Sequence, residues 1–418
     1  MRVSVIHPDI ANIGARRLPK NSLDEAIALT SALPDLEIEH SAVVTLKKAQ
    51  AGLLFGTGKV AELKQIFHDM EIGLVIIDGP LSPIQQRNLE KEWGVKVLDR
   101  TGLILEIFGD RAQTREGVLQ VDLAALNYQK SRLVRSWTHL ERQRGGLSFI
   151  GGSGETQIES DRRAIDDAIV RLKRQLDKVV KTRSLHRAAR AKVPYPIVAL
   201  VGYTNAGKST LFNHMTGAKV MAKDMLFATL DPTMRVIELP NGREVILSDT
   251  VGFISELPTQ LVAAFRATLE EVLDADLIVH VRDIAHPETV TQKMDVMEIL
   301  GDLGITDTAL ENVVEVWNKS DLLDERALET QTNQAVRTDK IELISALTGA
   351  GIPDLLDTIE DSLLDPVTTE TIKLGFAEGK RRAWLFAQNV VDGEDPTDYG
   401  FEITVTWTAR QAATFDTV

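Results

Sequence analysis

The chain has 418 residues, of which 44% are hydrophobic and 26% charged, as expected of a globular protein with two or three domains. The absence of cysteine excludes a disulfide framework and a thiolate metal site, and it fits a reducing cytoplasm. No apolar run approaches the ~18 residues that a membrane span needs, and the N-terminus lacks the apolar segment of a signal peptide. We therefore expect a soluble, cytoplasmic protein.

The formal net charge of −14 speaks against nucleic-acid binding by the chain as a whole, but the charge is unevenly distributed. The segment Arg100–Lys192 contains 19 lysines and arginines and 11 aspartates and glutamates, a local charge of +8, which leaves −22 on the rest. Such a segment is a candidate surface for a polyanion. The alternative, two helices whose solvated faces are basic and bind no polyanion, stays open on the charge alone.

Residues 1–110 alternate short apolar runs with helical patterns, which predicts an α/β domain with a mostly parallel sheet covered on both faces. The predicted strands are Val3–Ile6, Ala42–Leu46, Leu74–Ile77 and Val95–Leu98, and the predicted helices are Ser22–Leu33, Lys59–Met70 and Ser82–Trp93. Gly56-Thr57-Gly58-Lys59 opens a helix and could bind an anion, although a glycine turn leading into a helix is the commoner explanation.

Residues 111–192 carry two apolar heptad stripes, which predict an antiparallel helical hairpin. The stripes are Leu119, Leu123, Leu126, Leu133, Trp137 and Leu140, with Lys130 in one slot, and Ile158, Ile165, Ile169, Leu172, Leu176 and Val179. The glycine-rich loop Arg144–Gly154 joins the two helices. We interpret it as a flexible probe whose apolar Phe149 and Ile150 meet a partner, against the alternative of a connector without contacts.

Residues 195–365 are predicted to form a Ras-like P-loop GTPase domain. The apolar run Ile197–Val201 leads into the motif GxxxxGK[ST] and then into a helical pattern. We expect Lys208 to reach the β- and γ-phosphates and the Ser209 hydroxyl to ligate Mg²⁺. The nucleotide-binding residues predicted from this motif are Gly202, Tyr203, Thr204, Asn205, Ala206, Gly207, Lys208, Ser209 and Thr210.

Two later motifs identify the base. The predicted strand Val313–Trp317 runs into Asn318-Lys319-Ser320-Asp321, and the predicted strand Ile341–Ile344 runs into Ser345-Ala346-Leu347. The carboxylate of Asp321 can accept hydrogen bonds from both N1–H and the exocyclic amine of guanine, a donor pair that adenine lacks. We therefore predict guanine recognition by Asn318, Lys319, Asp321, Ser345, Ala346 and Leu347.

Two segments between these motifs are predicted to sense the γ-phosphate and to change conformation on hydrolysis. The first is Phe227-Ala228-Thr229-Leu230-Asp231, in which Thr229 is our choice for the second hydroxyl on Mg²⁺, with Thr233 as the competitor. The second is Asp249-Thr250-Val251-Gly252. Asp249 is expected to hold Mg²⁺ through water, and the Gly252 N–H is expected to meet the γ-phosphate.

Phe253 stands where many Ras-like GTPases place the glutamine that orients the attacking water. Because phenylalanine cannot orient water, we expect slow unassisted hydrolysis and a mild effect of Phe253→Ala on the chemistry. Asn205 either helps to seat a K⁺ between the phosphates or merely caps the loop, and both readings stay open. The predicted catalytic residues are Lys208, Gly252 and Asn205.

Across nearly its whole length the chain resembles the HflX family of ribosome-associated GTPases, most clearly in Leu81–Leu89, Val97–Thr101, Arg111–Gly117, Gly154–Gln157 and Phe227–Asp231. The resemblance implies that the hairpin loop reaches toward the peptidyl transferase region of the large ribosomal subunit. It also implies the splitting or rescue of stalled or idle ribosomes under stress. Gly151-Gly152-Ser153 departs from the Arg-Gly-Pro typical of the family. The expected contacts with ribosomal RNA are Arg142, Arg144, Gly145, Gly146, Phe149 and Gly154.

Residues 370–418 contain the apolar stretches Ala383–Val391 and Gly400–Thr408, which predict a small C-terminal α+β domain. The expected ligands and partners are GTP or GDP, Mg²⁺, K⁺ if Asn205 seats it, and the large ribosomal subunit, with no DNA and a monomeric chain. The alternatives are a K⁺-dependent GTPase associated with RNA modification and a non-catalytic switch that recruits a protein or membrane partner. Residues 1–110 show no site for one-carbon or redox chemistry, which argues against the first.

Overall fold

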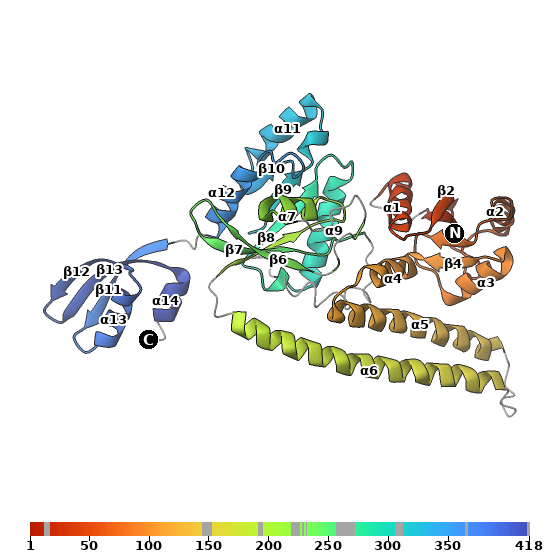
Figure 1. Cartoon of the computed structure of the whole chain (residues 1–418), viewed down its shortest axis with the longest axis horizontal. Coiled ribbons are helices and arrows are strands. Elements are labelled where there is room, and N and C mark those ends of the chain that lie inside the picture. The colour runs from red at the N-terminus through yellow and green to blue at the C-terminus, as the bar shows by residue number, and fades with distance from the viewer. Residues whose placement is uncertain are drawn as a thin grey trace. The chain divides into compact units, whose positions relative to one another are not determined.

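The computed structural model describes residues 1–11, 17–143, 153–190, 195–218, 226–227, 230, 232–255, 272–305, 312–363 and 367–415. The chain divides into two compact units, Met1–Leu356 and Asp357–Val418. Figure 1 shows the elements of both units in their order along the chain. No helix in the part of the chain that the structure describes is long and apolar enough to cross a membrane.

The N-terminal sheet has four parallel strands in the order β2-β1-β3-β4, with helices on both faces. Side chains alternate between the faces of a strand, so Val5 packs with helices α1 and α4 while its neighbour Ile6 packs with α2 and α3. The predicted parallel sheet covered on both faces is thus confirmed. The elements are β1 Arg2–Ile10, α1 Pro19–Ser31, β2 Glu37–Leu46, α2 Thr57–Asp69, β3 Leu74–Ile77, α3 Pro83–Trp93, β4 Lys96–Asp99 and α4 Arg100–Arg111.

Local sequence explains the ends of α3 and the start of α4. A capping box begins α3, in which Ser82 and Gln85 each bind the other's backbone, and Gly94 ends the helix in the left-handed conformation. The side chain of Asp99 caps α4 by accepting a hydrogen bond from the Gly102 N–H at 2.9 Å. Because Asp99 is also the last residue of β4, the helix follows the strand without a loop, and α4 is not among the elements predicted from the sequence pattern.

The heptad stripes correspond to two long helices, α5 (Arg115–Gln143) and α6 (Ser153–Arg190), which pack along each other as a hairpin (Figure 1). Lys130, the polar residue in the first stripe, forms an ion pair with Asp166 of the facing helix. The hairpin therefore has a charge pair at the slot where the apolar pattern is interrupted. The loop residues 144–152 lie outside the described part of the chain.

The second sheet has six strands in the order β10-β9-β8-β5-β7-β6, parallel except for the β6–β7 pair. The central strand β5 is apolar throughout because both its faces are covered, as in other parallel sheets. The Ras-like α/β class predicted for this domain is confirmed. The elements are β5 Ile197–Val201, α7 Lys208–Thr216, β6 Thr233–Glu238, β7 Glu244–Asp249, β8 Leu277–Asp283, α9 Thr289–Asp302, β9 Val314–Asn318, α11 Glu325–Ala335, β10 Ile341–Leu343 and α12 Ile352–Ser362.

The C-terminal unit contains an antiparallel sheet in the order β11-β13-β12 and two short helices. Its own hydrophobic core contains Leu385 of α13, Ile403, Val405 and Trp407 of β13, and Phe415 of α14. The α+β class predicted for this region is confirmed, although strand β11 is not among the predicted elements. The elements are β11 Val367–Gly375, α13 Gly379–Ala387, β12 Val391–Thr397, β13 Gly400–Thr408 and α14 Ala409–Phe415.

Candidate nucleotide-binding site

The P-loop lies between β5 and α7, and two of its glycines are required by close contacts. Gly202 has φ +148°, and a Cβ there would lie 2.1 Å from the Val281 carbonyl oxygen. Gly207 has φ +93°, and a Cβ there would lie 2.2 Å from Nδ2 of Asn318. Asn205, between them, is also left-handed at φ +59°. The loop thus passes close beneath the neighbouring strands and turns into the N-terminus of α7, a geometry that suits an anion.

Lys208 and Ser209, the first residues of α7, lie at the bottom of the loop. The buried Lys208 Nζ donates to the carbonyl oxygens of Gly202 at 3.1 Å and Tyr203 at 2.9 Å. Burial lowers the pKa of Lys208 to about 8, although the nearby Asp249 opposes the shift. Ser209 Oγ donates to Asp249 Oδ2 at 2.7 Å. A hydroxyl and a carboxylate therefore converge here, the hard oxygen ligands that Mg²⁺ prefers.

The second predicted switch segment packs directly against the P-loop. The Thr204 N–H donates to the Phe253 carbonyl oxygen at 2.7 Å, and the Phe253 N–H donates to the Gly202 carbonyl oxygen at 3.1 Å. A Cβ on Gly252 would lie 2.8 Å from Thr204 Cα and 3.0 Å from Lys208 Nζ. Glycine is therefore needed at 252 because the two segments touch there. The Phe253 ring is only 1% exposed, which is consistent with its inability to orient water.

The residues predicted to recognise the base are brought together at the ends of β9 and β10. Asn318 donates from Nδ2 to the Ala206 carbonyl oxygen at 2.8 Å and accepts at Oδ1 from the Ala346 N–H at 2.9 Å. Ser345 Oγ donates to Asp321 Oδ1 at 2.5 Å. These bonds join the P-loop to both later motifs. Leu347 is 75% exposed, and Asp321 is exposed too, so the fold leaves both of these predicted residues open to solvent.

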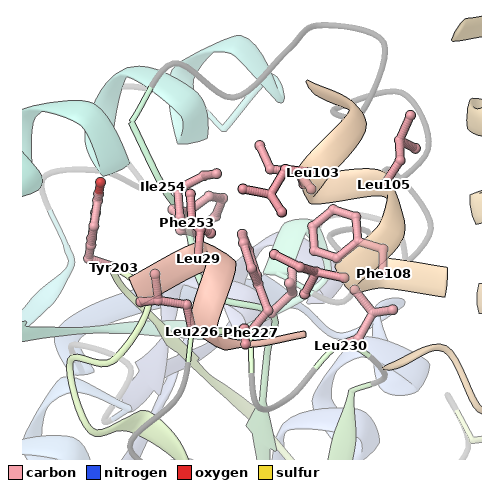
Figure 2. Close-up of a cluster of buried hydrophobic side chains, with 14 of the residues drawn as sticks. Leu29, Leu103, Leu105, Phe108, Tyr203, Leu226, Phe227, Leu230, Phe253 and Ile254 are labelled. Atoms are coloured by element: carbon pink, nitrogen blue, oxygen red, sulfur yellow. The ribbon is translucent and has the colours of Figure 1, made fainter. Parts of the chain in front are cut away.

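The first predicted switch segment is described in part. Leu226, Phe227 and Leu230 are buried, and the Phe227 ring meets the Phe108 ring of α4 edge-on at 4.7 Å (Figure 2). Ala228, Thr229 and Asp231 lie outside the described residues, so the predicted Mg²⁺ ligand Thr229 is not located. Thr233, its competitor, is the first residue of β6.

Of the predicted contacts with ribosomal RNA, Gly154 lies in the first turn of α6 and Arg142 near the end of α5. The others, Arg144, Gly145, Gly146 and Phe149, lie outside the described residues. Within the described residues no group of three or more His, Asp and Glu side chains could hold a metal ion. A Mg²⁺ ion at Ser209 and Asp249 would therefore depend on nucleotide phosphates for further ligands, as Mg²⁺ commonly does.

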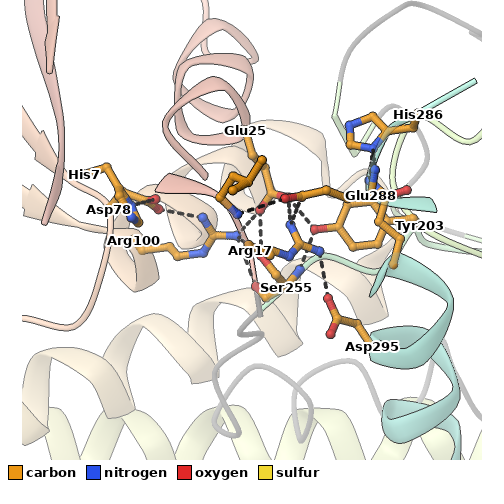
Figure 3. Close-up of polar contacts among 12 residues, drawn as sticks. His7, Arg17, Glu25, Asp78, Arg100, Tyr203, Ser255, His286, Glu288 and Asp295 are labelled. Atoms are coloured by element: carbon orange, nitrogen blue, oxygen red, sulfur yellow. Dashed lines mark hydrogen bonds and ion pairs between the residues drawn. The ribbon is translucent and has the colours of Figure 1, made fainter. Parts of the chain in front are cut away.

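Sequence reasoning missed a polar cluster that joins the P-loop domain to the N-terminal domain (Figure 3). Glu25 of α1 and Arg100 of α4 both contact Ser255, and Tyr203 of the P-loop donates its hydroxyl to Glu25. Arg17 forms an ion pair with Glu25 at 2.8 Å. We call Arg17, Glu25, Arg100, Tyr203 and Ser255 the interdomain cluster. An aromatic residue inside a phosphate loop was the one feature of the sequence that could have pointed to it.

Models of known protein families match four consecutive parts of the chain. They are described as GTP-binding GTPase N-terminal (residues 20–109), GTP-binding GTPase Middle Region (111–190), 50S ribosome-binding GTPase (197–319) and HflX C-terminal domain (330–417). Together they extend over most of the chain.

Similar proteins are found in bacteria. The GTPase HflX of Magnetococcus marinus is 47% identical over 399 residues, which cover 94% of this chain and 90% of the relative. The GTPase HflX of Escherichia coli strain K12 is 43% identical over 339 residues, covering 81% and 78%. A crystal structure of a GTP-binding protein from the archaeon Sulfolobus solfataricus in complex with GDP matches with a TM-score of 0.45 and 24% identity, covering 87% of this chain and 99% of that one.

Proposed function

Because the chain belongs to the HflX family of GTPases, we propose that it binds the large ribosomal subunit and uses GTP-dependent switching to split or rescue stalled and idle ribosomes. The enzyme activity of the family, hydrolysis of GTP, is the chemical part of this function. The observation that carries the proposal is the joined site around Asn318, next to a domain with a long basic hairpin.

In this proposal the P-loop holds the phosphates and Lys208 neutralises charge on the β- and γ-phosphates. The support is the left-handed turn at Asn205, the helix N-terminus that follows, and the burial of Lys208 beside Gly252. Charge that accumulates on the phosphate oxygens during transfer is stabilised by donors already fixed in place. Gly252 lies on the segment that packs against Thr204 and Lys208 of the loop, and we assign its N–H to the γ-phosphate.

Ser209 and Asp249 would hold the Mg²⁺ ion, with Thr229 as the further hydroxyl. When bound, the ion would supply positive charge that offsets the negative charge of the phosphates. Within the protein, the 2.7 Å hydrogen bond from Ser209 Oγ to Asp249 Oδ2 holds these two side chains next to each other. Asn205 lies in the P-loop in a left-handed conformation, and we include its contribution to a K⁺ site in the proposal.

Guanine is recognised by Asp321, with Asn318 and Ala346 completing the pocket edge. Ser345 orients the carboxylate of Asp321 through the 2.5 Å bond to Oδ1. A carboxylate fixed in this way accepts the two guanine donors without a further loss of conformational freedom, whereas adenine would leave it unpaired. In this proposal the base determines which nucleotide binds, and the presence of the γ-phosphate determines the conformation of the protein.

We assign the contact with ribosomal RNA to the hairpin. The basic segment Arg100–Lys192 provides favourable electrostatics for a polyanion, and the glycine-rich loop at 144–154 can bring backbone close to it. Arg142 and Arg144 are the proposed phosphate contacts, with Gly145, Gly146, Phe149 and Gly154 around them. We further propose that the protein acts as a monomer in the cytoplasm, where ribosomes are found.

Co-sedimentation with purified large subunits, in GDP and in a non-hydrolysable GTP analogue, tests the proposal. We expect binding in the analogue and weaker binding in GDP. Deletion of Gly146–Ser153 should leave GTP binding intact and abolish stimulation of hydrolysis by the subunit. Subunit-stimulated hydrolysis that survives this deletion would remove the loop from the mechanism, and equal sedimentation in both nucleotides would remove the switch.

The charges on the hairpin have a matched control. Arg142→Ala and Arg144→Ala should weaken binding to the subunit and reduce its dependence on salt. Arg163→Ala is the control because it also removes a positive charge from the hairpin, on α6. The Arg163 side chain is 76% exposed and pairs with Glu159 at 2.8 Å. The variant should leave binding to the subunit nearly unchanged.

A further inference from the structure

The P-loop contains a buried hydroxyl without a hydrogen-bond partner. Thr204 is 5% exposed, and its Oγ1 is the one buried side-chain hydroxyl among the described residues that has no such partner. Two other hydroxyls of the site are bonded, Ser209 Oγ to Asp249 at 2.7 Å and Thr250 Oγ1 to the Leu200 carbonyl oxygen at 2.6 Å. A buried hydroxyl without a partner is costly, so the position calls for a partner that the protein itself does not supply.

The methyl group of Thr204 restricts where this hydroxyl can lie. A Cβ on Gly252 would be 2.7 Å from Thr204 Cγ2, so the methyl group packs directly on that glycine. The same Cβ would be 3.0 Å from Lys208 Nζ. The side chains of Thr204 and Lys208 therefore meet at Gly252. Because a threonine side chain is stiff about χ1, a methyl group held in this way leaves the hydroxyl few positions.

The backbone of Thr204 is fixed as well. Its N–H donates to the Phe253 carbonyl oxygen at 2.7 Å, and the preceding residue, Tyr203, pairs with Phe253 in an isolated β-bridge. Since this N–H is bonded within the protein, the hydroxyl is the donor that residue 204 can offer to a ligand. A hydroxyl on a fixed backbone is preorganised, so it needs little rearrangement when a ligand binds.

The partner of this backbone bond is the residue that stands in the place of the missing glutamine. Many Ras-like GTPases use a glutamine at the position of Phe253 to orient the attacking water. The Phe253 ring is 1% exposed and lies in a core shared with Leu29 of α1 and Leu103 of α4 (Figure 2). The ring contributes to packing and offers no polar group. The Thr204 hydroxyl therefore lies beside the residue whose polar function is missing.

A hydroxyl can orient water as a glutamine amide does. It has one donor and two acceptor lone pairs, so it can accept a hydrogen bond from water and donate to a γ-phosphate oxygen at the same time. In hydrolysis the water oxygen bonds to the γ-phosphorus, and the bond from phosphorus to the bridging oxygen breaks and leaves its electron pair on GDP. The water proton passes to an oxygen of the released phosphate. The threonine hydroxyl neither gains nor loses a proton in this step.

From these contacts we propose that Thr204 is a catalytic residue whose Oγ1 orients the attacking water at the γ-phosphate, in place of the glutamine that Phe253 replaces. This inference rests on the proposed function, since it assumes that the γ-phosphate lies between Lys208 and Gly252. The role differs from the one proposed for Asn205. A K⁺ ion at Asn205 supplies positive charge, whereas the hydroxyl of Thr204 sets the direction of attack.

Thr204→Val tests the hydroxyl in the full-length protein, because valine keeps the methyl group on Gly252 and replaces only the hydroxyl. Single-turnover hydrolysis is measured as GDP formed from bound GTP in KCl. We expect the rate to fall about tenfold or more, since loss of one preorganised donor costs ~10²–10³ in a well-studied enzyme. The affinity for GDP, which lacks the γ-phosphate, should not change. Thr204→Ser keeps the hydroxyl and should retain most of the rate.

Thermal unfolding in excess GDP separates catalysis from a structural role. Because Oγ1 of Thr204 has no partner among the described residues, its replacement by a methyl group should leave the unfolding temperature unchanged or raise it. Thr30→Val is the matched control, since Thr30 is fully buried in α1 and its hydroxyl donates to the Ala26 carbonyl oxygen at 2.8 Å. This control should hydrolyse GTP at the unaltered rate and should gain no stability.

Three results would overturn the proposal. The first is a Thr204→Val variant as fast as the unaltered protein, and the second is a Thr204→Ser variant as slow as Thr204→Val. The third is a slower rate accompanied by lost GDP affinity or lower stability, because the hydroxyl would then support the loop and not the reaction. If the unaltered protein binds GTP but forms no GDP from it, the proposed function fails instead, so the two failures are distinguishable.

Discussion

The two ends of the nucleotide site are built in different ways. At the base end, Asn318, Asp321, Ser345 and Ala346 follow neighbouring parallel strands of one sheet and bind one another at 2.5–2.9 Å. At the proposed γ-phosphate end, the segment after Asp249 is held by helices α1 and α4 of the N-terminal domain. The contacts at the base end are thus made within one sheet, whereas the segment after Asp249 is held by contacts from another domain.

The largest expected effect is at the base end. Asp321→Asn should reverse the preference from guanine to xanthine, because the amide can donate to the carbonyl that replaces the guanine amine. Sites built to pair a polar group discriminate by up to ~10⁴. Competition between GTP and XTP measures the preference. Asp324→Asn is the control, since Asp324 caps α11 and asparagine caps helices equally well. A variant that still selects GTP would show that Asp321 does not recognise the base.

Truncation of the buried ring at the switch end comes next. Phe253→Ala should lower the free energy of unfolding by ~3–5 kcal/mol, because it leaves a cavity in the shared core, while the chemical step per bound GTP changes little. Urea unfolding and single-turnover hydrolysis separate these effects. At the base end, Leu347→Ala should cost less than ~0.5 kcal/mol, since that side chain is 75% exposed. Equal destabilisation by the two variants would contradict the contrast between the ends.

The dependence of hydrolysis on monovalent cations tests whether K⁺ assists catalysis in place of the glutamine that Phe253 replaces. If Asn205 seats K⁺, single-turnover hydrolysis should be about tenfold faster in KCl than in NaCl at equal ionic strength, a barrier difference of ~1.4 kcal/mol. Asn205→Ala should remove the difference while GDP binding persists. Equal rates in the two salts would leave Asn205 a structural cap of the loop.

The smallest effect concerns the pH dependence of the interdomain cluster. Burial raises the pKa of Glu25, but ion pairs with Arg100 and Arg17 lower it from 4.5 to about 2. The stabilisation by ionised Glu25 is therefore present above pH 4.5 and is lost as the pH falls toward 2. The stability gap between the unaltered protein and Glu25→Gln should shrink by about 1 kcal/mol or less between pH 6 and pH 4. A gap that widens on acidification would contradict the assignment.

Much of the fold could be predicted because buried strands are continuous apolar runs. Leu74–Ile77 and Ile197–Val201 are strands over the predicted residues. Helix α4 could not be predicted from the sequence, for two physical reasons. It follows β4 without a loop, and five of its apolar residues, from Leu103 to Phe108, are buried on more than one side, so the half-polar pattern of a surface helix is missing.

The candidate site divides in the same way. The P-loop and the motif at Asn318 could be predicted because their residues are close in sequence and their chemistry is specific. The contacts of Ser255 could not be predicted, since its partners Arg100 and Glu25 are 155 and 230 positions away along the chain. In sequence, each of those charges looks like an ordinary residue on a solvated helix face. Their burial and partners become visible only when two domains are placed together.

The attachment of α5 has a mechanical consequence. Arg132 and Tyr128 fasten the helix to the end of β4, and Gly102 of α4 lies so close beneath it that a Cβ would be 3.0 Å from the Tyr128 hydroxyl. The helix is ~43 Å long, and Tyr128 and Arg132 contact Asp99 about midway along it. We therefore expect a displacement at the end of β4 to move α5 as a whole rather than its N-terminal turn alone.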